Sequence, residues 1–275
     1  MPDIHEQIKE KFNTLSSAQK NVAHYIFENM EEAVVSSAQK IAEKSNVSEA
    51  TVHRFAQALQ FENFMEMKKE MIQFLHYNRR AVNNLLLTTA AKPDSWLEQH
   101  FLQEAENIVS TSKEISQMDI QRAAELLLSA RRIWIGGWRM GLSITSFMQF
   151  VLNYMLGNCS MIPQGEAAEY TSYFQKGDLV LLSAFPRYDS LTLKIAELAK
   201  AKGVSVIGLT DSSLSPICKF TTIHFFAKTK SNSFLDSYTA ALSICNAIIN
   251  EVAYIGGERI KFNINHVEEH FEKFK

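Results

Sequence analysis

The spacing of hydrophobic positions along the chain changes near residue 90. Before that point, apolar residues recur every three or four positions, which is the period of amphipathic helices. After about residue 107, helical stretches alternate with short, continuously apolar runs at 133–137, 178–185, 204–210 and 221–227. Runs of this length between helices are typical of parallel strands that helices cover on both faces. The pattern predicts an all-α domain followed by an α/β three-layer (αβα) sandwich with a parallel sheet.

A polar stretch at 85–99 separates the two patterns and contains Pro93, which does not fit a helix interior. We therefore expect a helical domain over 1–80, a linker and connecting helix over 81–106, an α/β domain over 107–254, and a tail over 255–275. The tail is polar and amphipathic, which predicts a helix that either exchanges between two copies of the chain or lies on the surface.

The segment 36–60 has the pattern of a helix-turn-helix. A short helix over 36–45 is followed by Asn46, a residue that tolerates positive φ, and then by Ser48, which can cap a second helix. Ser16 and Ser36 each precede a glutamine by three positions, which is the capping-box pattern. These serines predict the starts of two preceding helices.

The second helix of this unit has one apolar and one polar face. Val52, Phe55 and Leu59 share a stripe and are expected in the core. The opposite face enters the major groove in a DNA-binding helix-turn-helix, where Arg54 suits guanine and Gln57 suits adenine. We expect the DNA contacts to come from this face, its cap and a later lysine pair, namely Ser48, Ala50, Thr51, His53, Arg54, Gln57, Lys68 and Lys69.

The charge of the helical half gives no support of its own to DNA binding. Residues 1–80 carry a net charge of −1, and the whole chain carries −2, whereas nucleic-acid-binding domains usually present a basic footprint. Any three-helix domain also has an exposed polar face. DNA binding therefore requires a local concentration of positive charge, and we expect it to require two copies of the chain.

Several motifs lie in order over residues 15–71: Leu15-Ser16, Ala42-Glu43-Lys44, the run VSEATVHRF, Leu59-x-Phe61 and the segment around Lys68. Together they resemble the N-terminal domain of the RpiR family of bacterial transcriptional regulators. The run VSEATVHRF is far more specific than a general helix-turn-helix pattern. The resemblance implies that this domain binds operator DNA.

The second half carries IWIGG at 133–137, GDLVLLSAF at 177–185, ELAKAKGVSVIGLTD at 197–211 and LSP at 214–216. These motifs resemble a sugar isomerase (SIS) domain, the usual companion of the helix-turn-helix in RpiR proteins. The resemblance covers about residues 107–254. It implies a SIS-like sandwich that commonly dimerises and binds phosphosugars.

Two loops depart from the pattern of typical SIS domains, which is GxGxS after the first strand and SxSGxTxE after the second. Here Gly136-Gly137 is followed by Trp138-Arg139, and the second loop keeps Ser183 but has Phe185-Pro186 in place of Ser-Gly. An FxRY-type loop resembles a subgroup of RpiR regulators. Ordinary phosphosugar binding is therefore not implied by the loops alone, and the glycine pair is not a dinucleotide-binding motif.

The residue types in these loops still favour a site for an anion. Two arginines on neighbouring loops are able to grip a phosphate or a carboxylate, and helix N-termini add N–H donors. The alternative is that the arginines form salt bridges at a dimer interface, for example to Asp189. We expect the ligand-binding residues to be Gly136, Gly137, Arg139, Ser183, Arg187, Tyr188, Ser190 and Thr192.

Other kinds of chemistry find little support in the sequence. No zinc or disulfide pattern, P-loop or hydrolase motif occurs, so no metal, cofactor or catalytic residue is expected. No apolar run reaches the roughly 18 residues of a membrane span. The three scattered cysteines fit a reducing cytoplasm.

Two functions remain. The first is a cytoplasmic transcriptional regulator, not an enzyme, that assembles as a homodimer or a dimer of dimers. Its partners would be double-stranded operator DNA and an anionic, sugar-phosphate-like effector. The alternative is a sugar-phosphate isomerase with an accessory helical domain. Isomerisation needs a base near the sugar carbons, and the candidates are Glu166, Glu169 and His224.

Overall fold

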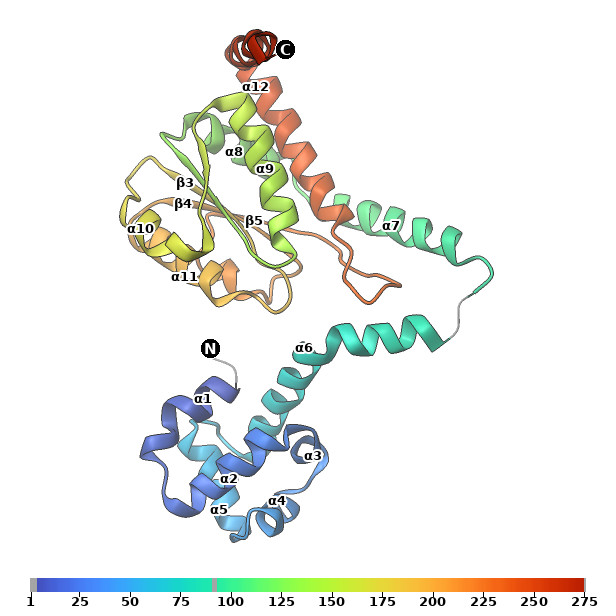
Figure 1. Cartoon of the computed structure of the whole chain (residues 1–275), viewed down its shortest axis with the longest axis vertical. Helices are drawn as coiled ribbons and strands as arrows, with labels where there is room; N and C mark the ends of the chain where they lie inside the picture. Colours follow the sequence, from blue (N-terminus) through green and yellow to red (C-terminus); the bar gives the residue numbers. More distant parts are fainter. Residues whose placement is uncertain (1–3, 91–92, 275) are drawn as a thin grey trace. The chain divides into compact units, whose positions relative to one another are not determined.

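The computed structural model describes residues 4–90 and 93–274. The chain divides into two compact units, and the boundary between them lies between Asn83 and Asn84, inside a long helix. Figure 1 shows that the first unit is helical and that the second surrounds a sheet with helices. Lys92, which precedes Pro93 in the expected linker, lies outside the described residues.

The first unit packs short helices around one apolar cluster. Its elements are α1 (Ile4–Lys11), a 3₁₀ turn (Phe12–Thr14), α2 (Ser17–Glu28), α3 (Met30–Val35), α4 (Ala38–Lys44), α5 (Glu49–Ala58) and the beginning of α6 (Phe64–Ala90). The apolar stripe predicted on α5 is confirmed, because Val52, Phe55 and Leu59 are all buried in this cluster. The cluster fixes which face of α5 points to solvent.

Serine caps set two helix starts of this unit as the sequence predicts. Ser16 forms the capping box with Gln19, and the Ser48 hydroxyl accepts a hydrogen bond from the backbone N–H of Thr51. Asn46 has φ 53°, the left-handed conformation that the turn between α4 and α5 requires. The helix-turn-helix is therefore built from the local signals that the sequence carries.

The prediction at Ser36 is wrong by one residue. The side chain that caps α4 is Ser37, which accepts from the backbone N–H of Lys40. The Ser36 hydroxyl instead donates to the carbonyl of Glu32 in the last turn of α3. Only two residues separate α3 from α4, so one serine ends the first helix and its neighbour starts the second.

The second unit is a three-layer αβα sandwich, which confirms the predicted fold class. Its five strands are all parallel and lie in the order β2-β1-β3-β4-β5. They are β1 (Ile133–Gly136), β2 (Cys159–Met161), β3 (Leu179–Ser183), β4 (Ser205–Thr210) and β5 (Ile223–Phe226). Four of them lie in the apolar runs of the sequence. The edge strand β2 was not predicted, because three residues leave no periodicity to detect.

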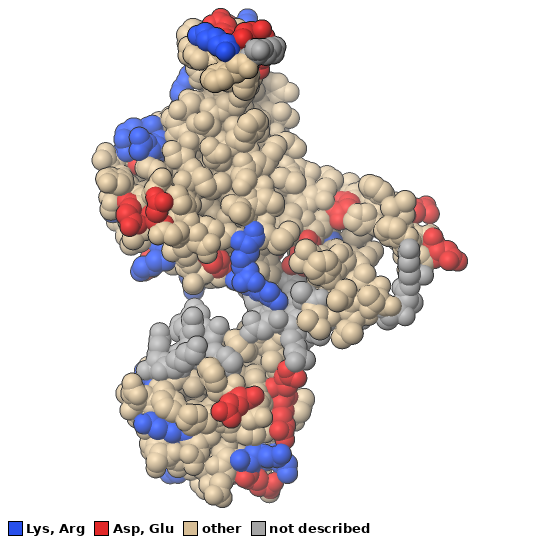
Figure 2. All heavy atoms as spheres, viewed as in Figure 1, with Lys and Arg blue, Asp and Glu red and all other residues tan. Residues whose placement is uncertain are grey.

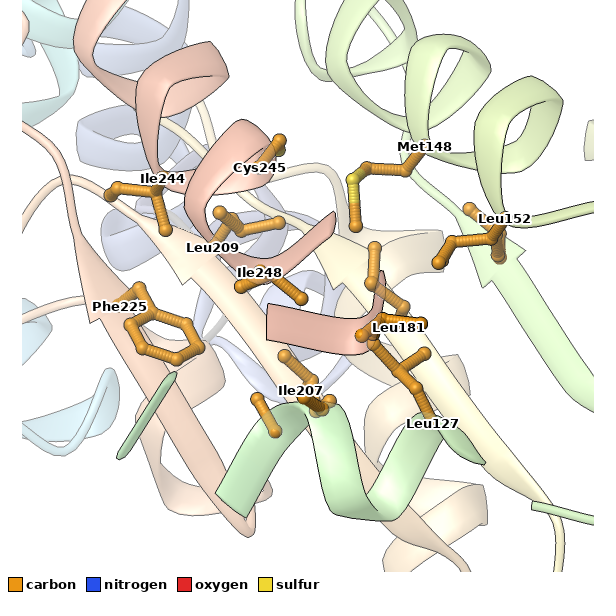
Figure 3. Packing of buried hydrophobic residues seen from close by; sticks show 14 of the residues in the cluster. Leu127, Met148, Leu152, Leu181, Ile207, Leu209, Phe225, Ile244, Cys245 and Ile248 are labelled. Atoms are coloured by element: carbon orange, nitrogen blue, oxygen red, sulfur yellow. The ribbon is translucent and has the colours of Figure 1, made fainter. Parts of the chain in front are cut away.

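Helices cover both faces of this sheet (Figure 1). One face is covered by α8 (Gln117–Ser129), α9 (Gly141–Leu156) and the first half of α12 (Thr239–Phe271), and α7 (Trp96–Ser112) packs against α12. The other face is covered by α10 (Ala167–Ser172) and α11 (Ser190–Ala201). Short 3₁₀ turns occur at Gln164–Glu166, Pro216–Lys219 and Glu272–Phe274. Figure 3 shows the first core layer, in which Leu181 of β3 lies among Leu127, Met148 and Ile248.

The last helix, α12, includes most of the predicted tail and bends at Gly257, whose φ of 43° and ψ of −120° are not helical. By length and composition alone, the stretch Thr239–Phe274 is apolar enough to cross a membrane. Core helices of globular proteins have the same property, and the buried residues of α12 belong to the sheet core.

The three cysteines are free thiols. Burial raises the pKa of both Cys159 and Cys245 to about 12. Burial, and then the nearby Asp211 carboxylate, also raise the pKa of Cys218, which is half-buried. Among the residues that the structure describes, no group of three His, Cys, Asp or Glu side chains is placed to hold a metal ion.

Candidate functional site

The N-terminal turns of α5 present a polar face to solvent. The exposed side chains of the cap and of α5 are Ser48, Glu49, Ala50, His53, Arg54 and, in the last turn, Gln57. Thr51, which was also expected to reach DNA, is buried. Its hydroxyl accepts a hydrogen bond from Arg54 Nη2 at 3.2 Å and shares another with Ser48 Oγ at 2.9 Å. Thr51 therefore holds the Arg54 guanidinium beside the start of α5.

Some of the charged side chains near this face already form hydrogen bonds or ion pairs within the chain. Lys68 Nζ donates to the Ser36 carbonyl at 2.8 Å, which ties it to the chain's own backbone, whereas Lys69 is exposed. On α4, Lys44 forms an ion pair with Glu32 at 3.0 Å, and the hydrogen bond to Glu32 raises the pKa of Lys44. The unit is close to neutral, and α5 itself exposes one carboxylate, that of Glu49 in its first turn, and one guanidinium, that of Arg54.

The second group of expected residues lies at the carboxyl ends of β1 and β3. The strand order places β2 and β3 on opposite sides of β1, so the direction of the crossovers reverses between β1 and β3. Open α/β sheets bind ligands in the crevice at such a switch point. The loop after β1 carries Arg139 and the loop after β3 carries Arg187. The sequence prediction that these arginines lie on neighbouring loops therefore agrees with the observed strand order.

Two glycines bring the start of α9 directly against the end of β3. A Cβ atom on Gly141 would lie 2.6 Å from Ser183 Oγ, and one on Gly137 would lie 3.0 Å from the Ser183 carbonyl oxygen. Both distances are shorter than side chains normally tolerate, so glycine is required for this approach. The Ser183 hydroxyl is buried, and the described residues give it no hydrogen-bond partner. Ser183 therefore lies beneath the loop that carries Arg139.

Both arginines occupy a backbone conformation that L-residues rarely adopt. Arg139 has φ 58° and Arg187 has φ 72°. Each such residue costs on the order of 1 kcal/mol or more and clusters at functional sites in proteins. Two arginines in this conformation on the loops after adjacent strands distinguish this edge of the sheet. Arg139 is exposed and Arg187 is half-buried, and Arg187 also takes part in other interactions of the chain.

Neighbouring side chains fix the remaining loop residues. The Tyr188 hydroxyl donates to Asp211 at 2.8 Å, which links the loop after β3 to the end of β4. Thr192 is buried, and its N–H and hydroxyl both donate to the Asp189 carboxylate, the N-cap of α11. Thr192 therefore helps to form the helix start, whereas Ser190 is exposed there. Asp211 was not among the expected site residues.

One aromatic contact joins the crevice to a distant loop. The ring of Phe185, in the loop after β3, packs edge-on against Tyr238 at 4.9 Å between ring centroids. Tyr238 precedes α12 and is separated from Phe185 by more than fifty positions in the sequence. The contact was not foreseen, because periodicity and motif spacing carry no information on such a pairing.

The candidate bases of the isomerase alternative are all exposed side chains. Glu166 and Glu169 are exposed in and beside α10. His224 is exposed on the edge strand β5, where its Nδ1 lies 3.1 Å from the hydroxyl of Thr221. Glu166 ends the 3₁₀ turn after β2, Glu169 lies in α10 and His224 lies in β5, so the three candidates are spread over three elements.

Known protein families match both units. The helix-turn-helix domain of the rpiR family matches residues 3–77, and the SIS domain matches residues 126–251. The chain belongs to the RpiR family of transcriptional regulators. This RpiR-family regulator is 26% identical over 226 residues to the HTH-type transcriptional regulator HexR of Pseudomonas aeruginosa, a match that spans 81% of this chain and 78% of HexR.

Solved structures show the same fold. The sugar isomerase domain of an RpiR transcription factor from Sphaerobacter thermophilus matches 64% of this regulator and 99% of its own chain, with a TM-score of 0.62 and 21% identity. The Vibrio vulnificus NanR protein complexed with ManNAc-6P matches 99% of both chains, with a TM-score of 0.61 and 18% identity. The relatives with curated names are transcriptional regulators, and this RpiR-family chain is a regulator and not an enzyme.

Proposed function

We propose that this RpiR-family regulator is cytoplasmic and reads operator DNA through the exposed N-terminal turns of α5. The observation that carries the proposal is Arg54, which is exposed, held by Thr51 and located two turns from the Ser48 cap. Ala50, His53 and Gln57 share its face and complete the reading surface. Lys69 is free to contact phosphate, whereas Lys68 has to leave the Ser36 carbonyl first.

A mobility-shift assay on the DNA upstream of the regulator's own gene tests this function. We expect retardation at low salt that weakens steeply as salt is raised, because phosphate contacts release counterions. A parallel assay on sugar phosphates should show no isomerisation. Isomerase activity together with no retardation of the DNA at low salt would contradict the proposed regulator and support the enzyme alternative.

We propose that the regulator dimerises through the outer faces of α9 and α12. The 16 residues of α9 contain no charged side chain, and α12 has only Glu251 before its bend at Gly257. Figure 2 shows the surface over these helices almost free of charged side chains. The occupant that fits an uncharged helical face on this scale is the same face of a second copy, packed in a symmetric dimer.

Phe150→Glu is expected to weaken this dimer by more than tenfold. Phe150 is 67% exposed on α9, and two-fold symmetry would bring the new carboxylates of both copies into one apolar interface. Tyr173→Glu is the matched control, because Tyr173 is an equally exposed aromatic beside α10 on the opposite layer. Sedimentation velocity over a range of concentrations measures the change. A dimer that withstands Phe150→Glu places the interface elsewhere.

We propose that the crevice between β1 and β3 binds an anionic effector of the sugar-phosphate class. The support is the pair of strained arginines above the buried Ser183 hydroxyl, together with the N–H groups at the starts of α9 and α11. The fold similarity to NanR, a structure that contains ManNAc-6P, agrees with this class of ligand. Gly136, Tyr188 and Ser190 complete the proposed lining.

Arg139→Ala and Arg187→Ala are each expected to weaken effector binding by about tenfold or more, since each removes a charge-assisted contact to the anion. A thermal-shift screen of sugar phosphates identifies the ligand, and calorimetry measures the variants. Arg132→Ala is the control, because Arg132 lies at the amino end of β1, away from the crevice. Equal affinity of all three variants for the ligand would contradict this site.

A further inference from the structure

A hollow of about 540 Å³ lies in the α/β unit between α7 and the loop 231–238 that leads into α12. Phe101 and Ile108 of α7 form an apolar part of its wall. Glu104, Asp236 and Ser237 contribute polar groups. The volume is in the range of small-molecule sites, which are about 300–1,000 Å³. The crevice between β1 and β3 does not account for this hollow, because its lining comes from other elements.

The charge of the lining determines which ligands it accepts. Two carboxylates, those of Glu104 and Asp236, lie in the wall together with the His100 ring, and among the residues that the structure describes no lysine or arginine lines it. Lys228, a few positions before the loop, forms an ion pair with Glu114 at 2.6 Å. The hollow therefore disfavours phosphates and carboxylates and favours a cation.

The wall is already fixed in position by hydrogen bonds between the loop and α7. The Ser237 hydroxyl donates to the Glu104 carboxylate and accepts from the backbone N–H of Thr239. Asn107 of α7 donates to the Lys230 carbonyl at 2.7 Å. Because these hydrogen bonds already hold the lining in place, ligand binding costs little conformational entropy, and modest contacts suffice for binding.

We propose that this hollow binds a small primary amine with an apolar body. The ammonium group donates up to three hydrogen bonds, and the carboxylates of Glu104 and Asp236 offer acceptor oxygens in the lining. Phe101 and Tyr238 supply aromatic surface for the apolar body and for a cation–π contact. The Tyr238 ring also contacts Phe185 in the loop after β3, so one aromatic contact links the proposed amine site to the proposed anion site.

The loop that lines the hollow also contacts α6. The Thr88 hydroxyl donates to the Asn232 carbonyl at 3.0 Å, and the Asn84 side chain lies 3.5 Å from the Phe234 carbonyl oxygen. The same helix begins at Phe64, in the DNA-binding unit. Occupancy of the amine site therefore acts on a loop that is bonded to the helix common to both units.

Three probes of equal size separate charge from shape: benzylamine, benzyl alcohol and benzoate. With the full-length protein, calorimetry should show benzylamine binding at least tenfold more tightly than benzyl alcohol and no binding of benzoate. Asp236→Asn should lower the affinity for benzylamine by about tenfold and leave the affinity for benzyl alcohol unchanged. Glu106→Gln is the control, because Glu106 is exposed on α7 outside the hollow, and it should change nothing.

A further variant locates the site without altering its charge. Ala105 lines the hollow, and Ala105→Trp should fill it and abolish binding of both benzylamine and benzyl alcohol. Equal affinities for the amine and the alcohol would overturn the proposal, as would benzylamine binding that survives Ala105→Trp. These measurements involve no DNA, so their failure leaves the proposed operator binding intact.

Discussion

Replacing Arg54 with alanine should lower the affinity for the operator by one to two orders of magnitude. A bidentate arginine–guanine pair contributes about 1–3 kcal/mol of discrimination, and Thr51 holds this guanidinium in place before DNA arrives. The loss should be greatest on the cognate sequence and small on unrelated DNA, because a base contact carries the specificity. Fluorescence anisotropy with both DNA duplexes at fixed salt measures the difference.

Two comparison variants make the Arg54 result specific. Arg122→Ala removes an exposed arginine of α8 in the other unit and should leave operator affinity unchanged. Lys69→Ala should lower the affinity for both duplexes alike and reduce the slope of the logarithm of affinity against the logarithm of salt concentration by about one unit. If Arg54→Ala folds normally and binds its operator as tightly as the parent, α5 is not the reading helix.

Leu181→Ala is expected to destabilise the α/β unit by about 2–5 kcal/mol, the usual cost of truncating a fully buried leucine. Leu181 is completely buried on β3, which is paired with β1 on one side and with β4 on the other. In Figure 3 its side chain lies among those of α8, α9 and α12, so few neighbours are free to move into the space. Urea unfolding measures the loss.

The placement of tryptophan makes this measurement selective. Trp96, Trp134 and Trp138 all lie beyond Asn84, so tryptophan fluorescence reports on the α/β unit alone. Leu214→Ala provides the control, because Leu214 is 90% exposed and its loss should change the free energy of unfolding by less than about 0.5 kcal/mol. A similar small change for Leu181→Ala would show that the packing around β3 is looser than the structure implies.

Local sequence signals predicted the parts of the structure that local forces determine. The cap at Ser48 and the turn at Asn46 depend on neighbouring residues, and both are observed. The apolar runs that became β3 and β4 were detectable because buried parallel strands are continuously hydrophobic. The error at Ser36 has the same origin, because two adjacent serines offer equivalent hydroxyls and only the packing of α3 selects between them.

Features that depend on distant residues were predicted less completely. The prediction that Arg139 and Arg187 lie on neighbouring loops came from the ends of the expected parallel strands, and the observed pairing of β1 with β3 agrees with it. The contact between Phe185 and Tyr238 and the hollow beside α7 depend on how loops meet in space. The periodicity and motif spacing of a single sequence carry no information on these contacts between loops, so only the structure reveals them.

The position of the cysteines bears on how the regulator responds to oxidants. Burial holds the pKa of Cys159 and Cys245 far above the ordinary value of a thiol, so both stay protonated at neutral pH, and oxidation proceeds through the thiolate. The remaining thiol, Cys218, belongs to the α/β unit, and the DNA-binding unit contains no cysteine. The helical unit therefore offers no thiol to an oxidant, and any thiol-linked response of the regulator has to start in the α/β unit.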